Sequence, residues 1–316
     1  MEFGIYLRPA KTFGAMKQLT QFAENNNFTG VFLNDHVHGF KSGGKEPYLE
    51  AWTIISALAP LTNRIKLGHI VLFNSLRNPA YLAKSITSLD IISSGRYELM
   101  IGAGWNNSEY EAYDLMERGR GMPSAKERVD RLKESLKILR FMLNNEVTNF
   151  EGLYWNLKNA YNIPQPVQKN MRISVGGSKD RMIKITAKYA DGINVGSGLN
   201  RTQTIIDKLK PELKKHNKLL DDYYISGFGS VTIAKNDEEY KELLLDLSKR
   251  TNKSIEEIEK DSLIGTPDIL VKKFDRLKKL GVKMYIVSIQ PAESLEEILA
   301  RYELFVKEVM VKLNKY

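Results

Sequence analysis

The sequence has no cysteine and only four histidines among its 316 residues. Without cysteine, the chain cannot be a disulfide-stapled domain or hold zinc or an iron–sulfur cluster on thiolates. It also lacks an uninterrupted apolar run of the roughly 20 residues that cross a bilayer. The first residues lack the basic and apolar regions of a signal peptide. We therefore expect a cytoplasmic protein with no membrane partner.

An excess of positive charge is present, but it is moderate. The chain carries 47 Lys and Arg against 38 Asp and Glu, a formal net charge of +9, and 42% of its residues are hydrophobic. This composition is typical of a folded protein and not of a disordered one. Lysine pairs such as Lys272-Lys273 and Lys278-Lys279 fall on polar helix faces, which favours a solvated surface over a nucleic-acid partner. A third interpretation of the excess charge is a positively charged cavity entrance that attracts an anionic cofactor.

Short β-rich runs alternate with amphipathic helical segments along the chain. Apolar residues recur at helical spacing after the runs, and Asn78-Pro79 and Thr266-Pro267 are typical helix starts. The eight predicted strands are Phe3–Leu7, Gly30–Leu33, Lys66–Phe73, Tyr97–Ile101, Arg172–Val175, Gly192–Val195, Tyr224–Ala234 and Val282–Ser288. Eight such units predict an α/β fold, a (β/α)8 TIM barrel, rather than an open doubly wound sheet.

The connections between these units differ in length. We expect a single barrel domain over residues 1–316, with insertions near residues 105–125, 144–170 and 235–262. The segment Phe150–Trp155 within the second insertion is typical of a small hairpin.

Polar side chains follow the second predicted strand, in Asn34-Asp35-His36-Val37-His38. The loops after the strands build the active-site face of a barrel. A carboxylate beside an imidazole there could form an acid–base pair or bind a cofactor, and a polar turn capped by Asp35 is the alternative. His36 and His38 lie two residues apart without a carboxylate cluster, so we expect no metal site.

The third and fourth strand ends are apolar or small. The run Ile70-Val71-Leu72 could back a planar ring or belong to the core, and His69 is interpreted as a buried barrel histidine. The segment Gly102-Ala103-Gly104 permits close approach of the backbone to a ligand, and Trp105 offers an aromatic wall. This Gly-x-Gly lacks the third glycine of a dinucleotide-binding motif.

The fifth strand ends in Val175-Gly176-Gly177-Ser178, directly before a helix predicted near Asp180–Tyr189. Free N–H groups at the start of that helix, with Ser178 as its cap, would bind an anion or phosphate, and a plain glycine turn is the alternative. A flat apolar seat, an Asp-His pair and a phosphate cradle together suit a flavin-type cofactor with a phosphorylated side chain.

As an ordered series, these and other motifs resemble the bacterial luciferase-like monooxygenase superfamily. Within it, the chain looks most like the deazaflavin (coenzyme F420)-dependent oxidoreductases. The matching motifs are Asn34-Asp35-His36, Pro47–Thr53, Arg64–Gly68, Arg77–Ala80, Leu89-Asp90, Ser94–Arg96, Gly102–Trp105 with Glu109-Tyr110, Pro164–Gln168, Val175–Gly177, Ala190–Gly192 and Gly265–Pro267.

The resemblance implies a luciferase-like barrel with insertions, and a homodimer. It implies a non-prolyl cis peptide at Ile70-Val71, a bulge that supports one face of the ring. Asp35 would hydrogen-bond the deazaflavin, and His36 matches the acid/base of the sugar-phosphate dehydrogenase branch. The segment Gly176-Gly177-Ser178 would bind the cofactor phosphate, and Gly102–Trp105 would border ring and substrate.

Three functions follow as hypotheses. The first is an F420-dependent oxidoreductase that transfers a hydride between the deazaflavin C5 and a small organic substrate, with His36, Asp35 and Trp105 at the site. Trp105 stands where the sugar-phosphate enzymes have a catalytic Glu, which argues against a sugar-phosphate substrate. The second is an FMN-dependent monooxygenase of the same fold. The third is a non-catalytic flavin- or deazaflavin-binding protein.

Overall fold

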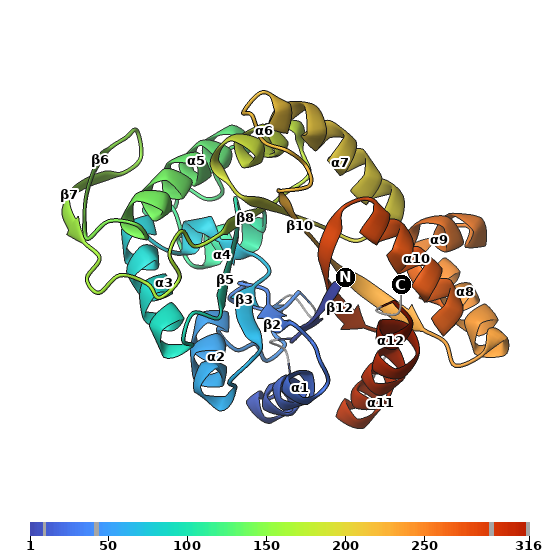
Figure 1. Ribbon diagram of the computed structural model, residues 1–316. Helices are drawn as coiled ribbons and strands as arrows, with labels where there is room; N and C mark the ends of the chain where they lie inside the picture. Colours follow the sequence, from blue (N-terminus) through green and yellow to red (C-terminus); the bar gives the residue numbers. More distant parts are fainter. Residues whose placement is uncertain (9–10, 41–43, 291–293, 314–316) are drawn as a thin grey trace.

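Eight parallel strands close into a barrel in the computed structural model, which describes residues 1–316 except 9–10, 41–43, 291–293 and 314–316 (Figure 1). The barrel strands are β1 Glu2–Tyr6, β2 Gly30–Leu33, β3 Lys66–His69, β5 Tyr97–Gly102, β8 Ile173–Gly176, β9 Gly192–Val195, β10 Tyr224–Ile233 and β12 Val282–Ile289. Strand β1 pairs with β2 and β12, and β10 pairs with both β12 and β9, which closes the ring. The predicted (β/α)8 barrel is therefore confirmed.

One predicted strand is wrong in its detail. The run 66–73 is not continuous: β3 ends at His69, the Ile70-Val71 peptide is cis, and the chain resumes as β4 Leu72–Phe73. Strand β4 pairs with β5, whereas β3 pairs with β2 as well as β5. The apolar pattern continues through the break because residues on both sides are buried. The cis peptide itself agrees with the resemblance.

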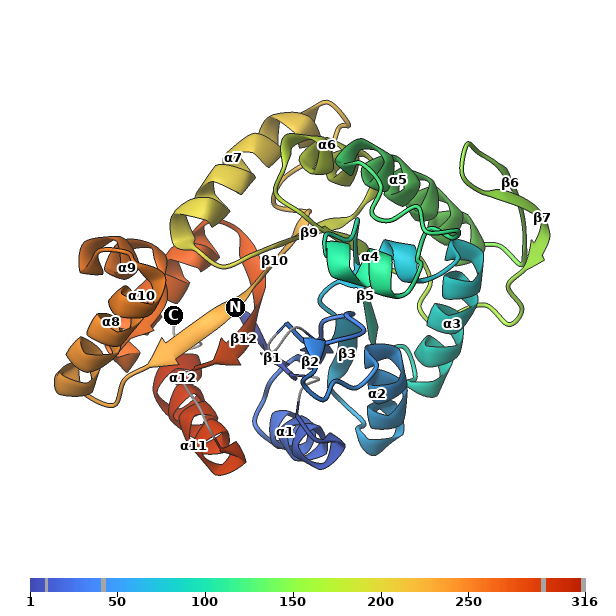
Figure 2. The same cartoon turned by 180° about the vertical axis from the view of Figure 1, so that it is seen from behind.

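Helices surround the barrel on all sides (Figure 2). The α-helices are α1 Phe13–Asn25, α2 Ala51–Leu58, α3 Pro79–Ile92, α4 Asn107–Ala112, α5 Ala125–Met142, α6 Asp180–Tyr189, α7 Leu199–Lys214, α8 Asp237–Thr251, α9 Ile255–Asp261, α10 Pro267–Lys279, α11 Leu295–Phe305 and α12 Val311–Leu313. Short 3-10 helices cover Ala59–Leu61 and Asn74–Leu76, and a π-helical turn joins α11 to α12. Among the helices that the structure describes, none combines the length and apolarity needed to span a bilayer.

Local chemistry explains several helix starts. Asn78 caps α3, and its side-chain oxygen accepts hydrogen bonds from the backbone N–H groups of Ala80 and Tyr81. Pro79 occupies the first position, where the missing N–H costs nothing. Helix α10 begins in the same way after Thr266, although the Thr266 side chain makes no capping hydrogen bond.

Three long connections are inserted between the elements of the barrel. Residues 105–125 follow β5 and contain α4. Residues 144–170 carry the antiparallel hairpin β6 Val147–Glu151 and β7 Asn156–Tyr161, which stands outside the ring of helices (Figure 1). The predicted hairpin is therefore confirmed. Residues 235–262 form α8 and α9, and the chain then enters β11 Leu263–Gly265, a short strand paired with β10.

Apolar side chains fill two layers. A large core lies between the strands and the helices, and a smaller one fills the barrel interior. The interior core consists of Phe32, Ile70, Met100, Tyr224, Met284 and Ile286. Because the parallel strands all point the same way, their carboxyl ends and the loops that follow meet at one face.

Candidate active site

A cavity of about 730 Å³ opens at the carboxyl ends of the strands. This volume lies in the usual range for sites of small molecules and cofactors. All twelve of the site residues that the sequence singled out line it: Asp35, His36, Ile70, Val71, Leu72, Gly102, Ala103, Gly104, Trp105, Gly176, Gly177 and Ser178. The structure thus brings together segments that are up to 143 residues apart in the chain, from Asp35 to Ser178.

The cis bulge forms the floor of the cavity, and two glycines make room for it. A Cβ atom on Gly102 would lie 2.7 Å from Val71 Cγ2, and one on Gly176 would lie 2.9 Å from Val71 Cγ1. Real Cβ atoms do not approach other atoms this closely, so a larger residue at either position would displace the bulge. These glycines therefore provide space first for the Val71 side chain, whereas the sequence suggested space for a ligand.

Gly104 is required by both its backbone and its surroundings. Its φ is +78°, and a Cβ there would lie 1.9 Å from Phe73 Cε2. We expect Gly104→Ala to lower the free energy of unfolding by about 2–4 kcal/mol, because it adds left-handed strain to overpacking. Gly119→Ala is the control, since Gly119 has φ +67° but no atom within 4 Å of a Cβ, and should cost only about 1 kcal/mol. Urea unfolding of both variants measures the difference, and equal losses would contradict the packing role of Gly104.

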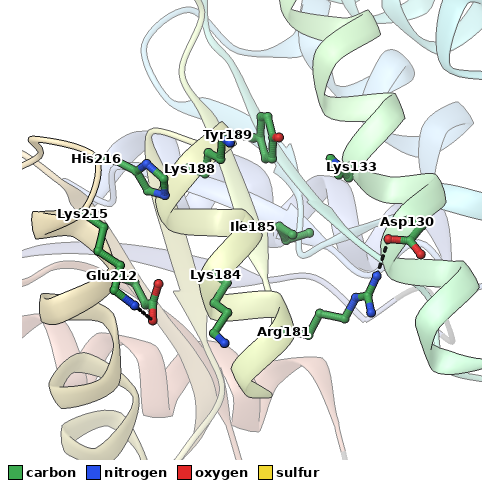
Figure 3. Close-up of a pocket in the computed structure, with 10 residues that line it drawn as sticks. All are labelled: Asp130, Lys133, Arg181, Lys184, Ile185, Lys188, Tyr189, Glu212, Lys215 and His216. Atoms are coloured by element: carbon green, nitrogen blue, oxygen red, sulfur yellow. Dashed lines mark hydrogen bonds and ion pairs between the residues drawn. The ribbon is translucent and has the colours of Figure 1, made fainter. Parts of the chain in front are cut away.

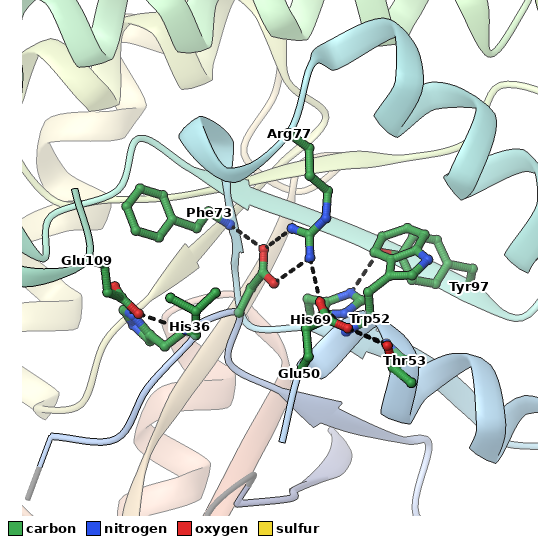
Figure 4. A network of polar contacts seen from close by, with 11 residues as sticks. His36, Glu50, Trp52, Thr53, His69, Phe73, Arg77, Tyr97 and Glu109 are labelled. Atoms are coloured by element: carbon green, nitrogen blue, oxygen red, sulfur yellow. Dashed lines mark hydrogen bonds and ion pairs between the residues drawn. The ribbon is translucent and has the colours of Figure 1, made fainter. Parts of the chain in front are cut away.

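Asp35 is buried and both of its oxygens are engaged. Arg77 Nη1 donates to Oδ2 at 2.5 Å and Nη2 to Oδ1 at 3.0 Å, and the Phe73 N–H donates to Oδ2 at 2.9 Å. Arg77 Nη2 also donates to Glu50 Oε1 at 2.8 Å (Figure 4). Asp35 thereby fixes β4, directly after the bulge. A hydrogen bond from Asp35 to a cofactor ring remains a proposal.

The network extends behind the bulge. The His69 ring stacks on Trp52 with centroids 5.1 Å apart, and its Nδ1 lies 2.9 Å from the Tyr97 hydroxyl (Figure 4). Burial lowers the pKa of His69 to about 4, so the ring is neutral at pH 7. Burial would raise the pKa of the Glu50 carboxyl, but hydrogen bonds from Thr53 and Trp52 outweigh it and the pKa is lowered. His69 is a buried structural histidine, as its strand indicated.

His36 pairs with an acid that received no role from the sequence. Its Nδ1 lies 2.7 Å from Glu109 Oε2, and the Glu109 side chain is fully buried. Glu109 Oε1 accepts the backbone N–H of Val37 at 2.8 Å. A carboxylate at Glu109 can only accept, so this contact would hold the His36 proton on Nδ1 and leave Nε2 as an acceptor. The His36–Glu109 dyad therefore has the geometry of an oriented general base.

Aromatic rings wall the cavity around His36. Phe40 and Trp105 stack with centroids 5.8 Å apart, and both meet the His36 ring edge-on, at 4.7 and 5.6 Å. Trp105 is 64% exposed and Phe40 is 51% exposed, although both line the cavity. Phe73 lies against His36 from another side at 6.2 Å. A substrate beside His36 would contact mainly apolar surface.

The other end of the cavity is positively charged. Helix α6 is capped by Lys179 and has no side-chain cap, so the prediction of Ser178 as the cap is wrong. The chain extends one residue further before the helix starts, and Ser178 Oγ instead accepts a hydrogen bond from Arg201 Nη2 at 3.0 Å. The first N–H groups of α6 thus lack a side-chain partner, and Arg201 and Arg181 also line this end. These groups fit a phosphate.

The luciferase-like monooxygenase family matches residues 1–306. The chain therefore belongs to the luciferase-like monooxygenase family.

Particular relatives differ in the chemistry that their names record. Over 222 residues, 66% of this chain, the sequence is 33% identical to the F420-dependent glucose-6-phosphate dehydrogenase of Amycolatopsis mediterranei (strain U-32). Over 194 residues, 60% of the chain, it is 30% identical to the pyrimidine monooxygenase RutA of Serratia proteamaculans (strain 568). These matches span 62% and 51% of the relatives' own lengths.

Among solved structures, the coenzyme F420 dependent tetrahydromethanopterin reductase of Methanopyrus kandleri superposes with a TM-score of 0.78. The superposition covers 99% of both chains at 20% sequence identity. At this identity the likeness supports the fold alone.

Proposed function

We propose that this protein is a coenzyme F420-dependent oxidoreductase that moves a hydride between the deazaflavin C5 and a small organic substrate. The observation that carries the proposal is the His36–Glu109 dyad, at 2.7 Å, facing a cavity that has an apolar floor and a cationic end. The bound deazaflavin would supply the carbon that gives or takes the hydride. Similarity to a relative named as F420-dependent supports the same cofactor.

The chain's own residues would bind and orient the cofactor. The bulge at Ile70-Val71 would support one face of its ring, and Asp35 holds that bulge in place through Phe73 and Arg77. The start of α6, with Ser178 and Arg201, would hold the phosphate. Trp105 and Phe40 would exclude water from the substrate side.

His36 would manage the proton that accompanies hydride transfer. When a substrate alcohol is oxidised, the carbon loses a hydride and the hydroxyl loses a proton, which His36 Nε2 would accept. In the reverse direction the same nitrogen would return the proton to the carbonyl oxygen. Glu109 would stabilise the positive ring that forms in the first case.

The cofactor can be identified by fluorescence titration of the apoprotein with the deazaflavin and, in parallel, with FMN. Selective micromolar binding of the deazaflavin is expected. A panel of alcohols and carbonyl compounds, followed by the deazaflavin absorbance, then tests turnover. Selective binding of FMN would overturn the proposal, and tight deazaflavin binding without turnover across the panel would favour the non-catalytic alternative.

An FMN-dependent monooxygenase is the second candidate. Similarity to RutA favours it, since this relative is named a monooxygenase. The cavity's apolar floor and cationic end also suit FMN. Oxygen consumption with supplied reduced FMN distinguishes the two functions, because hydride transfer to the deazaflavin consumes no oxygen.

Glu109→Gln tests whether the dyad orients His36. The Val37 N–H needs an acceptor, so the Gln oxygen would take it and the amide NH2 would face His36 Nδ1. His36 would then carry its proton on Nε2, the wrong nitrogen for a base. We expect turnover to fall roughly 10- to 100-fold with cofactor affinity retained.

The split between kcat and KM separates orientation from a merely structural role. Loss of the carboxylate should lower kcat and leave KM near its wild-type value, whereas a distorted site would also raise KM. Thermal unfolding serves as the folding control. Unchanged turnover in a folded Glu109→Gln variant would contradict the dyad.

A further inference from the structure

Positive charge gathers in two grooves beside the phosphate end of the cavity. The first groove, of about 460 Å³, lies between the starts of α6 and α7. It shares Ser178, Lys179 and Arg201 with the cavity, so it continues directly from the proposed phosphate site. Its remaining lining residues are Asp180, Thr204, Ile205 and Lys208.

The second groove, of about 390 Å³, crosses the outer face of α6 between α5 and the end of α7 (Figure 3). It shares Arg181 with the cavity. Figure 3 shows Lys184 and Lys188 along α6, with Lys133 on α5 and Lys215 beyond α7. The other lining residues are Asp130, Ile185, Tyr189, Glu212 and His216. We call the two together the α6 groove.

The α6 groove is far more cationic than the rest of the chain. Its 17 lining residues include eight Lys or Arg and three Asp or Glu, an excess of five charges out of +9 for the whole sequence. Each acid is already paired within the groove, as Asp130–Arg181, Asp180–Lys208 and Glu212–Lys215. Five cations have no ion pair in the part of the chain that the structure describes: Lys133, Lys179, Lys184, Lys188 and Arg201.

Three ammonium groups also crowd around one ring. The Nζ atoms of Lys188, Lys137 and Lys133 lie 5.4, 5.7 and 6.0 Å from the Tyr189 centroid. The ring face attracts each of them, but the like charges repel one another. An anion among them would relieve the repulsion. Both parts of the α6 groove share residues with the cavity, so the groove has the charge and the position of a site for a negatively charged chain that starts in the cavity.

We propose that the α6 groove binds a chain of carboxylates that continues from the cofactor's phosphate. This inference rests on the proposed function, because such a chain belongs to the glutamylated deazaflavin and not to FMN. A chain leaving the phosphate at Ser178 enters the first groove at once. Lys184 and Lys188 are four residues apart on one helix face, so their Cβ atoms lie about 5–6 Å apart. Two neighbouring ammonium groups suit the successive carboxylates of such a chain. Because the α6 groove opens from the cavity, it favours a chain attached to the cofactor over nucleic acid.

The test compares two cofactor forms: a deazaflavin whose phosphate carries several glutamates, and the same phosphorylated deazaflavin without glutamates. Affinity is measured for the wild type and for Lys184→Glu/Lys188→Glu, at low and high salt. Lys184→Gln/Lys188→Gln is the milder variant in case the first fails to fold. Lys272→Glu/Lys278→Glu on α10 changes the net charge equally at exposed positions away from the groove.

We expect the wild type to bind the glutamylated form roughly tenfold more tightly, since several exposed ion pairs add up to about that factor. The α6 variants should abolish this preference and leave affinity for the form without glutamates unchanged. High salt should reduce the preference, and the α10 variant should bind both forms as the wild type does. Equal binding of both forms by the wild type would overturn the inference and leave the proposed function intact. An oligonucleotide that displaces the glutamylated form would overturn it in favour of nucleic acid. Failure to bind either form would reject the proposed function itself.

Discussion

Turnover of a His36→Ala variant is expected to fall by roughly 10²–10⁴-fold, the usual contribution of general acid–base catalysis. The cofactor affinity should persist, because the bulge and the phosphate end do not depend on the imidazole. The loss should appear in kcat, since proton transfer occurs in the transition state. Steady-state kinetics with the first substrate found, together with a cofactor titration, measure both quantities.

His38→Ala is the matched control. His38 lies two residues away, its Nδ1 lies 2.8 Å from the Gly39 carbonyl oxygen, and its ring stacks near Tyr113. It is not among the described residues that line the cavity. Its removal should leave kcat within a few fold. A similar loss in both variants would show that the loop as a whole matters, and unchanged turnover of His36→Ala would remove His36 from the mechanism.

A double variant tests whether the dyad acts as one unit. In the proposed mechanism Glu109 affects turnover through His36, and the Gln oxygen would keep the hydrogen bond from Val37, so Glu109→Gln should add little to His36→Ala. Additive losses would mean that Glu109 has a second role.

The barrel could be predicted because its pattern is local. Each strand is a short buried run, and the helices that follow repeat apolar residues at helical spacing. Helix starts such as Asn78-Pro79 follow from capping chemistry within three residues. The strand ends differ from the prediction by a residue or so, because the last residues of a strand are decided by pairing with its neighbours.

The site's interactions could not be predicted in the same way. His36 and Glu109 are 73 residues apart, and although Glu109-Tyr110 is one of the motifs behind the resemblance, the sequence gives no sign that Glu109 pairs with His36. The break inside 66–73 has no signal in hydropathy, and it was expected only through the family resemblance. Arg77 and Arg201 likewise acquire their partners through the closure of the barrel.

Among the single substitutions considered, loss of Arg77 should lower the free energy of unfolding the most. Arg77→Met removes both hydrogen bonds to Asp35 but keeps much of the apolar volume. Asp35 is 2% exposed, so its charge would be left buried with only the Phe73 N–H as a partner. Breaking a buried ion pair from one side costs about 3–5 kcal/mol. Urea unfolding should show this loss, and cofactor affinity should fall with it because β4 and the bulge loosen.

A second substitution tells whether the stranded charge is the cause. Asp35→Asn keeps an oxygen for the Phe73 N–H and removes the charge. The Arg77→Met/Asp35→Asn double variant should therefore recover a large part of the stability lost by Arg77→Met alone. If the double variant were no more stable than the single one, the buried charge would not be the cause, and the cost would be assigned to lost packing of Arg77 against Trp52, whose ring centroid lies 5.5 Å from the guanidinium carbon. Recovery of cofactor affinity alongside stability would assign Asp35 to holding the bulge, whereas recovery of stability alone would assign it a direct hydrogen bond to the ring.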